Sequence, residues 1–372
     1  MRILVTGGDG FIGRWVCDEL RAQGHDPIVG DRHLEGPGDL LDVRDRVAVM
    51  ESVSHVEGVI HLAAVLGSSE TIQDPRPAIE TNILGAVNVM DACVHYGVPL
   101  AMTSVGNAWL RSAGAGTYTI VKECAADLFE MYRRYRGLKG NLVRPTNAYG
   151  PGQSVHRDFG GHSSVKKIIP SFINAALQGR PIEVYGDGEQ ISDCVWVGDV
   201  AKVIVGALTE AAAGRLHPIA EVGPEESMTV NEVANEVANE VAMAVEVAVS
   251  VAPCSDWHGF VGTRHIPMRP GEVKGVTKAD TSTLEPYGIT LTPLSEGLKR
   301  TVAYYRATNP PPGENLVASA RVRRSMPYEH ETPTPYFDHS YRHHDAIHAG
   351  REAEFLATKT SQATHAKFTE SV

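Results

Sequence analysis

Short apolar runs alternate with longer amphipathic stretches along the first 145 residues of the chain. The runs with the length of buried strands are residues 2–5, 27–30, 58–62, 100–104 and 141–144, and the stretches with a helical period are residues 11–23, 79–96 and 118–136. Strands that alternate with helices of this length indicate a parallel sheet covered on both faces. The pattern predicts an α/β fold, a Rossmann-like doubly wound parallel sheet.

The pattern becomes less regular after residue 145, where glycine and proline cluster. It predicts a strand over residues 182–185 and helices over residues 168–178 and 197–212. Three Asn-Glu-Val-Ala repeats, the first at residue 231, place Val233, Val237 and Val241 on one face of a further helix.

Three regions follow from these patterns. Residues 1–165 form the first domain, to which later segments return, and residues 166–306 form a smaller α/β region. Residues 307–372 open with a proline-rich stop and sustain no apolar period, so we expect a poorly structured tail. Its histidines are irregularly spaced, and we assign no metal site to them.

Composition excludes several classes of protein. Of the 372 residues, 42% are hydrophobic and 21% charged, as in ordinary globular proteins. The net charge of −11 opposes nonspecific attraction to nucleic acids, and no apolar stretch reaches the length of a membrane span. The five cysteines form no Cys-x-x-Cys pair, which disfavours a disulfide framework and a zinc site. We expect a cytoplasmic protein without a nucleic-acid, membrane or metal partner.

A glycine-rich turn joins the first predicted strand to the first predicted helix. Gly7 permits a tight turn, Gly10 lets the backbone approach a pyrophosphate, and Gly13 allows close packing of the helix on the strand. Unpaired N–H groups at the start of the helix then face the phosphates. This context predicts a dinucleotide site.

The residues after the second strand bear on the choice of dinucleotide. Asp31 lies 18 residues beyond Gly13, where a carboxylate accepts hydrogen bonds from the adenosine ribose and repels a 2′-phosphate. NAD is therefore favoured over NADP, although the neighbouring Arg32 offers a phosphate ligand. Asp42 and Val43 precede the next helix and are candidates to meet the adenine.

A tyrosine and a lysine are four residues apart in the helix predicted over residues 118–136. Tyr118 and Lys122 therefore lie on the same helical face. A nearby ammonium favours the phenolate form of a tyrosine, which can then remove a proton from an alcohol while hydride leaves the same carbon.

Taken together, these motifs resemble the extended short-chain dehydrogenase/reductases, in particular the NAD-dependent epimerase/dehydratase family typified by UDP-glucose 4-epimerase. The resemblance spans about residues 1–306. Besides the glycine turn and the Tyr118/Lys122 pair, it is carried by residues 61–64, 81–85, 144–151, 184–188, 199–201 and 269–272.

The resemblance implies NAD as cofactor and a small-molecule substrate, a nucleotide-diphosphate sugar. The implied cofactor contacts are Gly7, Gly10, Phe11, Ile12, Gly13, Asp31, Arg32, Asp42, Val43, Leu62, Ala63, Ala64, Thr103, Tyr118, Lys122 and Pro145. The implied catalytic residues are Tyr118, Lys122 and Ser104, and the implied substrate contacts are Asn147, Arg269, Ser104 and Tyr185. The resemblance also implies a homodimer formed by the helices at residues 83–94 and 120–132.

Three positions depart from the family pattern. Val105 stands where a strand-end hydroxyl orients the substrate alcohol, so Ser104 or Thr103 must supply that hydroxyl or it is missing. No Asp-Glu pair follows, which disfavours a sugar dehydratase because elimination needs a second acid/base couple. Ser192 replaces an arginine that binds phosphate.

The leading hypothesis is an NAD-dependent nucleotide-sugar epimerase that oxidises a sugar hydroxyl to a ketone and reduces it again on the other face. The alternative is an NAD(P)-dependent reductase or dehydrogenase of a ketosugar or another small alcohol, which Ser192 and the missing hydroxyl favour. A cofactor-sensing protein with little turnover is a third hypothesis, which the intact Tyr118/Lys122 pair disfavours.

Overall fold

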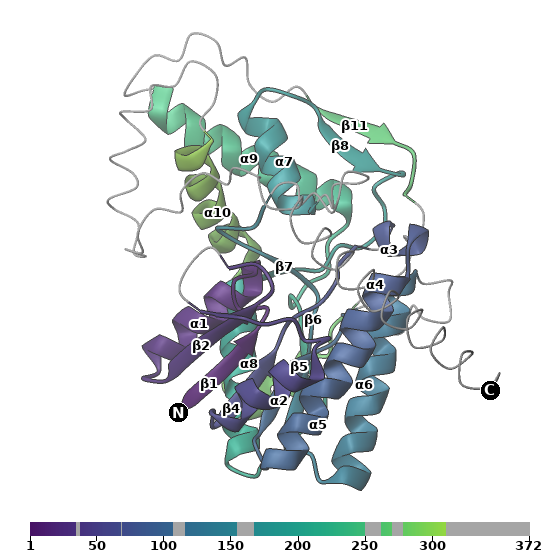
Figure 1. The fold of residues 1–372 in the computed structure, drawn as a ribbon. Helices are drawn as coiled ribbons and strands as arrows, with labels where there is room; N and C mark the ends of the chain where they lie inside the picture. The colour runs from purple at the N-terminus through teal and green to yellow at the C-terminus, as the bar shows by residue number, and fades with distance from the viewer. Residues whose placement is uncertain are drawn as a thin grey trace, which may run out of the picture. The chain divides into compact units, whose positions relative to one another are not determined.

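The main sheet has seven parallel strands, which lie between residues 2 and 222 of the chain (Figure 1). Its strand order is β10 (Ala220–Val222), β6 (Gly140–Pro145), β5 (Leu100–Thr103), β4 (Gly58–His61), β1 (Arg2–Thr6), β2 (Asp26–Asp31) and β3 (Asp39–Leu40). Successive strands run outward from β1 in both directions, so the order reverses between β1 and β4. Ligands of doubly wound sheets bind at the carboxyl ends of the strands at such a reversal.

The computed structural model describes residues 1–34, 38–67, 69–106, 116–154, 167–249, 262–269 and 278–309. All of them belong to one compact unit that spans Met1–Arg157 and Ser164–Arg323. The tail predicted over residues 307–372 lies outside the described residues from 310 onward. Within these ranges, no helix combines the length and the apolar character needed to cross a bilayer.

Helices cover both faces of the sheet, which explains why its strands are apolar at successive positions. Ile3 and Val5 of β1 pack in one cluster with α1 (Phe11–Ala22) and α8 (Val197–Ala212). Leu4, which points to the other face, packs in a second cluster with α2 (Arg46–Ser54), α5 (Ala86–Tyr96) and α6 (Thr117–Arg136). Alternate residues of one strand thus enter different cores, as a doubly covered parallel sheet requires.

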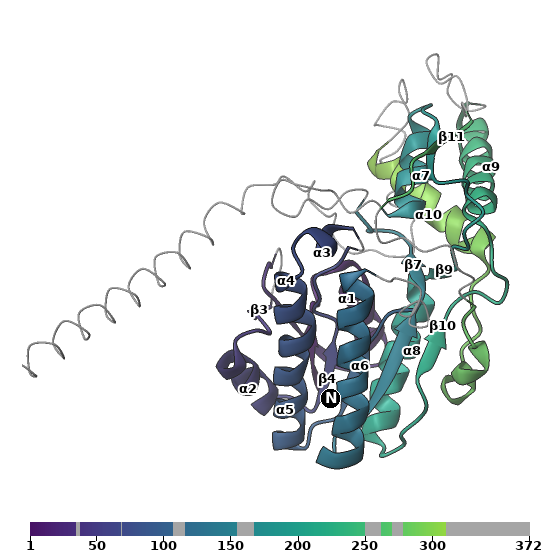
Figure 2. The same cartoon turned by 90° about the vertical axis from the view of Figure 1, so that its right-hand side faces the viewer.

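A second helical group packs around its own core (Figure 2). It contains α7 (Ile168–Leu177), α9 (Val230–Val249) and α10 (Leu294–Thr308), with two parallel strand pairs. The pairs are β8 (Ile182–Tyr185) with β11 (Thr263–Ile266), and β7 (Asn147–Tyr149) with β9 (Cys194–Trp196). The predicted face of the Asn-Glu-Val-Ala helix is confirmed, because Val233, Val237 and Val241 are all buried.

The predicted fold class is confirmed, and the differences are local. The helix expected over residues 79–96 is three consecutive segments, namely α4 (Arg76–Ile79), a π-helical stretch (Glu80–Gly85) and α5. The pattern predicted neither the short strands β3, β7, β9, β10 and β11 nor the helices α3 (Glu70–Gln73) and α10, and it missed a 3-10 helix (Thr281–Tyr287). Most of the missed strands have only two or three residues, which are too few to show a period.

Candidate active site

Close backbone contacts shape the glycine loop between β1 and α1. Gly7 has a φ of +71°, and a Cβ atom there would lie 2.7 Å from the Ala63 nitrogen. A Cβ atom on Gly13 would collide with the Gly7 oxygen. Glycine is therefore needed at both positions, and the loop lies directly against the segment that follows β4.

The N-terminus of α1 is open toward this loop. Gly10 is the N-cap residue, and no side chain among the described residues caps the helix. The N–H groups of the first turn, at Phe11, Ile12 and Gly13, have no acceptor within the helix. Such N–H groups, together with the helix dipole, favour an anion, so this end of α1 fits the pyrophosphate of a dinucleotide.

Two carboxylates predicted to contact the cofactor lie near the end of β2. Asp31 accepts hydrogen bonds from the main-chain N–H groups of Asp9 (3.2 Å) and His33 (3.1 Å). Arg44 Nε donates to both carboxylate oxygens of Asp42, at 3.0 Å each. Burial favours a higher pKa for Asp42, but the hydrogen bonds from Arg44 outweigh it and lower the pKa. Asp42 is thus a charged acceptor at the adenosine side of the sheet.

The segment after β4, residues 62–64, is fixed to β1 and to the π-helical stretch. Leu62 N donates to Thr6 O at 3.0 Å. One residue beyond the segment, Val65 N donates to Asn82 Oδ1 at 2.8 Å, and Asn82 Nδ2 returns a bond to Val65 O at 3.0 Å. The backbone at Ala63 and Ala64 is therefore held in place beside the glycine loop, and it carries only small side chains.

The predicted pair, Tyr118 and Lys122, lies in the first two turns of α6. Lys122 is buried, and its Nζ donates to the carbonyl oxygen of Thr103, at the end of β5, at 2.6 Å. The charge of Lys122 also reaches His61 at the end of β4, whose Nδ1 lies 2.7 Å from Thr6 Oγ1. The ammonium therefore stands at the carboxyl edge of the sheet, next to the residues that precede the glycine loop.

Burial dominates the ionisation of this group of residues. It raises the pKa of Tyr118 to about 12, which is opposite to the direction expected from a nearby ammonium. The physical reason is that the phenol is desolvated by burial. Burial lowers the pKa of Lys122 to about 8, against the opposing charge of Glu123, and lowers the pKa of His61 to about 3.

Ser104, predicted as the catalytic hydroxyl, is turned toward another partner. It is buried and donates a hydrogen bond to Glu123 Oε1 at 2.6 Å. Glu123 lies five residues beyond Tyr118 and therefore on a different face of α6. Thr103 contributes its carbonyl oxygen to Lys122. Val105 is half-buried. The segment that follows, residues 107–115, lies outside the described residues.

A buried ion cluster behind Lys122 was not predicted from the sequence. Arg144 Nη2 lies 3.0 Å from Glu123 Oε2, and Arg144 Nη1 lies 3.3 Å from Glu221 Oε1. The cluster joins α6, β6 and β10, and all three side chains are at most 16% exposed. An acidic residue directly after the lysine was the visible signal, but its partners come from strands far along the chain.

Three of the predicted substrate contacts, Asn147, Tyr185 and Arg269, follow β6 along the chain. The guanidinium of Arg269 lies over the ring of Tyr185, 4.5 Å from its centroid. Asn147 begins β7 with an exposed side chain, and its N–H donates to Asp193 O at 3.0 Å. Ser192 is buried beside Cys194, with Oγ 3.5 Å from Sγ. Arg269 and Tyr185 are thus brought together. Residues 270–272 of the same motif are outside the described residues.

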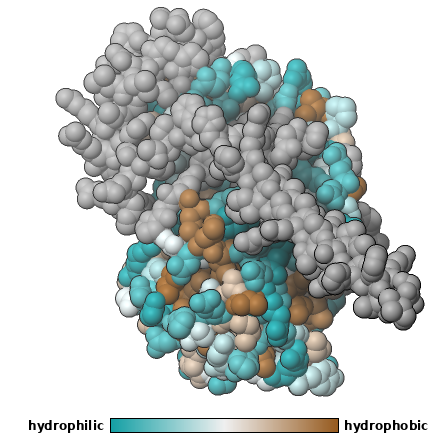
Figure 3. All heavy atoms as spheres, in the orientation of Figure 1, coloured by the Kyte–Doolittle hydropathy of each residue, from teal (hydrophilic) through white to brown (hydrophobic). Residues whose placement is uncertain are grey.

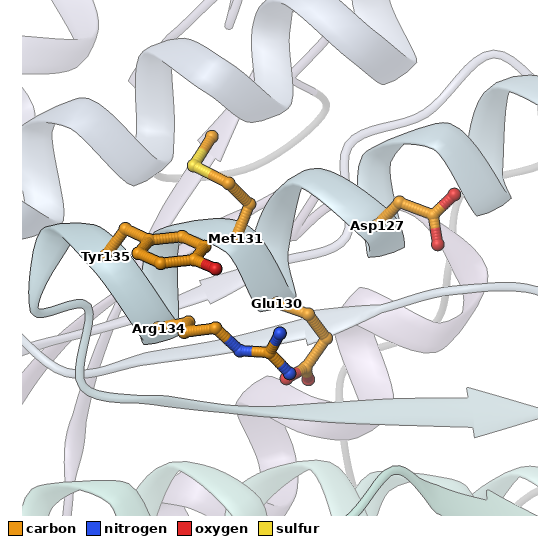
Figure 4. A pocket seen from close by; sticks show the side chains of 5 residues that line it. All are labelled: Asp127, Glu130, Met131, Arg134 and Tyr135. Carbon is orange, nitrogen blue, oxygen red and sulfur yellow. The ribbon is translucent and has the colours of Figure 1, made fainter.

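A pocket of about 190 Å³ lies elsewhere, on the outer surface of α6 (Figure 4). It is lined by Asp127, Glu130, Met131, Arg134 and Tyr135. All five residues follow the Tyr118/Lys122 pair by at least one turn, and none of them belongs to the carboxyl edge of the sheet. This pocket is therefore separate from the candidate active site.

The sheet, the glycine loop and the Tyr118/Lys122 pair define a dinucleotide-dependent enzyme of the short-chain dehydrogenase/reductase type. The chain belongs to the NAD-dependent epimerase/dehydratase family, whose model matches residues 3–223. Membership confirms the predicted family and NAD as its cofactor, and the glycine loop and the open end of α1 fit that cofactor.

Relatives with different activities share this fold. The chain is 30% identical over 261 residues to a UDP-N-acetyl-alpha-D-glucosaminuronate decarboxylase of Bacillus cytotoxicus, a match that covers 63% of this chain and 78% of the relative. It is 27% identical over 254 residues to a putative UDP-glucose 4-epimerase of Methanocaldococcus jannaschii, covering 62% and 79%. A structure of the Thermus thermophilus UDP-glucose 4-epimerase with NAD has a TM-score of 0.68 and 26% identity, covering 82% of this chain and 99% of that one.

Proposed function

We propose that this protein is an NAD-dependent nucleotide-sugar epimerase that acts by transient oxidation of a sugar hydroxyl and re-reduction of the ketone. The observation that carries the proposal is the position of Lys122, whose Nζ bonds the Thr103 carbonyl at the carboxyl edge of the sheet, with Tyr118 one turn away. Relatives that act on UDP-sugars, by their names, support this substrate class.

In the proposed reaction Tyr118 takes the proton of the sugar alcohol and later returns it. NAD, when bound, supplies the hydride acceptor and donor. Lys122 remains an ammonium at neutral pH, because its pKa of about 8 lies above that pH. Its charge offsets part of the cost of forming a phenolate in a buried place. Gly7, Gly10 and Gly13 hold the pyrophosphate end of the cofactor, and Asp31 holds its ribose.

We assign the diphosphate of the substrate to Arg269, with Asn147 and Tyr185 beside it. A guanidinium matches phosphate oxygens with two parallel hydrogen bonds. Tyr185 supports this role because its ring fixes the plane of the guanidinium. Since Ser192 is buried and uncharged, Arg269 is the main cation of this clamp, and the ketosugar turns about it between the two hydride steps.

A reductase or dehydrogenase in the same fold is the second candidate, and the hydrogen bond of Ser104 to Glu123 favours it. An enzyme without a strand-end hydroxyl orients its substrate alcohol through Tyr118 alone. A dehydratase is disfavoured, because no Asp-Glu pair follows the end of β5 to act as the second acid/base couple.

The test uses purified protein and a panel of UDP-sugars, with separation of the isomers and no added dinucleotide. Interconversion supports the epimerase, and a stoichiometric need for NADH or NADPH selects the reductase instead. Tyr118→Phe is the control, because it removes the proton acceptor and keeps the ring. A panel without any conversion by the wild-type protein, with or without cofactor, contradicts both candidates.

We further propose a homodimer that packs the outer faces of α5, α6 and the π-helical stretch. Leu84 and Ile120 are 54% and 45% exposed there. Apolar residues appear on the part of the surface where α5 and α6 lie (Figure 3). Leu84→Glu should convert the dimer to monomer in sedimentation velocity. Val47→Glu, which changes a still more exposed apolar residue on α2, should not. A wild-type monomer would contradict this proposal.

The proposal includes a cytoplasmic location. Cys17, Cys93, Cys124 and Cys194 are unpaired in the described part of the chain. Unpaired thiols fit a reducing compartment. Intact cells are treated with a membrane-permeant alkylating reagent under conditions that denature the protein. Complete alkylation of these thiols would support the location, and disulfides in their place would contradict it.

A further inference from the structure

A second carboxylate lies beside Asp31 at the end of β2. Asp9, in the glycine loop, donates its main-chain N–H to Asp31 Oδ2 at 3.2 Å. Its side chain is only 16% exposed, and its Oδ1 accepts a hydrogen bond from Arg14 Nε at 3.1 Å. Two acidic residues from different segments therefore converge on one point.

That point is the ribose end of the dinucleotide site. Asp31 closes β2 where a carboxylate receives the hydroxyls of the adenosine ribose. Because the main-chain N–H of Asp9 is bonded to the carboxylate of Asp31, the two residues are direct neighbours at this place. NAD and NADP differ only at this place, by a phosphate on the 2′-oxygen.

We propose that Asp9 is a specificity-determining residue that works with Asp31 to exclude the 2′-phosphate of NADP. A doubly charged phosphate next to two carboxylates is repelled by both. NAD has no charge at this position, and its ribose hydroxyls donate to the same carboxylate oxygens. Asp9 thus penalises one dinucleotide and leaves the other unaffected.

Asp9 has a second effect in the same direction through Arg14. The guanidinium of Arg14, on the first turn of α1, is 41% exposed and is the cation bonded to Asp9. A guanidinium is a good phosphate ligand. The Asp9 carboxylate neutralises this cation and holds its Nε, which keeps it from serving as a partner for a 2′-phosphate.

Arg32 does not overturn this selection. It follows Asp31 directly and was the one residue whose position favoured NADP. Its positive charge acts on Asp42, whose carboxylate Arg44 also holds. Arg14, Arg32 and Arg44 therefore each face an acidic partner, which is Asp9 for Arg14 and Asp42 for the other two.

The inference rests on NAD binding and not on the proposed sugar substrate, so its test contains no sugar. Binding of NAD and of NADP is measured by titration calorimetry for the wild-type protein and for Asp9→Asn. We expect Asp9→Asn to tighten NADP binding by about fivefold to tenfold and to change NAD binding by less than about twofold. Asp18→Asn removes the same charge from α1, the helix that follows the loop, where Asp18 pairs with Arg21, and should change neither.

The double variant Asp9→Asn with Arg14→Gln separates the two effects. It should lose part of the gain in NADP binding, because the released guanidinium is gone. An NADP/NAD affinity ratio that is the same in Asp9→Asn and in the wild type overturns the proposal, as does an equal shift in Asp18→Asn. If Asp9→Asn does not fold, as judged by its melting curve, Asp9→Ser replaces it, with the same expected ratio and the same contrary result.

Discussion

Two regions carry the proposed reaction, and they are built differently. The first is the edge formed by β1 and β4, where we propose that the cofactor binds. The second is the region around β8 and β11, where we propose that the substrate diphosphate binds. At the first, backbone meets backbone, as where Gly7 lies against Ala63. At the second, single long side chains carry the function, as where Arg269 stacks on Tyr185. A backbone contact tolerates almost no substitution, whereas a side chain can be exchanged without loss of the fold.

This difference explains why the departures from the family pattern fall where they do. The glycine turn is complete, whereas Val105 and Ser192 stand where the family resemblance implies a strand-end hydroxyl and a phosphate-binding arginine. Relatives named as a decarboxylase and as an epimerase match the same fold. The cofactor end therefore identifies the family, and the substrate end decides the reaction.

The largest effect is expected at Tyr118, which the proposed reaction uses in both hydride steps. Tyr118→Phe should lower kcat by about 1,000-fold or more, because general acid/base catalysis contributes on the order of 10² to 10⁴ and both hydride steps need it. NAD affinity should be unchanged. Steady-state rates and calorimetry on the same preparation check both, and a rate within tenfold of the wild type would remove Tyr118 from the mechanism.

One added methyl group in the glycine loop should be enough to weaken cofactor binding. Gly7→Ala should weaken NAD binding by about 100-fold, because the Cβ atom meets the Ala63 backbone and the φ of +71° is strained. Gly24→Ala is the matched control, since Gly24 has a φ of +76° and an added Cβ atom meets nothing within 4 Å. It shares the strain without the collision, so equal losses of NAD binding would contradict the role given to the backbone contact.

The substrate end should respond to a side-chain change without any effect on the cofactor. Arg269→Ala should raise the KM for a nucleotide sugar by about tenfold to 100-fold, the value of a charged hydrogen bond of about 1.5–3 kcal/mol. NAD binding should stay the same. Arg264→Ala, an exposed arginine on β11 paired with Glu183, is the control. If Arg264→Ala raised the KM as much, a general charge effect would replace the clamp.

The smallest expected effect is a pH dependence of stability from His61. The pKa of His61 is about 3 in the folded chain and 6.5 in the unfolded one. As the pH falls below 6.5 the unfolded chain gains a proton that the folded chain does not take, so stability is lost. We expect a loss of about 1–2 kcal/mol between pH 6.5 and pH 5 from this group.

Urea unfolding at the two pH values measures that loss. His61→Gln should lose less stability over the interval than the wild type does. His55→Gln, at the exposed C-cap of α2, should behave as the wild type. An unchanged pH dependence in His61→Gln would contradict the burial of a neutral imidazole.

Local pattern sufficed for most of the long elements, though not for the 15-residue helix α10, and for the residues of the glycine loop. The helix that carries Tyr118 and Lys122 begins at Thr117, within one residue of its predicted start. The sequence could not show that Ser104 bonds Glu123, or that Arg144 joins Glu123 to Glu221, because these partners are brought together only by the order of the strands.

The ionisation of the catalytic pair was equally out of reach of the sequence. The spacing of Tyr118 and Lys122 favoured a lowered pKa for the phenol, whereas burial raises it. The extent of desolvation depends on the neighbours of a side chain in three dimensions and not on its spacing along a helix.

The most direct test of the account is to let the protein convert a nucleotide sugar in D₂O without added dinucleotide and to analyse the product by mass spectrometry. Hydride removed from a carbon and returned to it never exchanges with solvent. We therefore predict an epimerised product that carries no deuterium on the carbon whose configuration has changed. One deuterium per turnover at that carbon would contradict transient oxidation at the Tyr118/Lys122 pair.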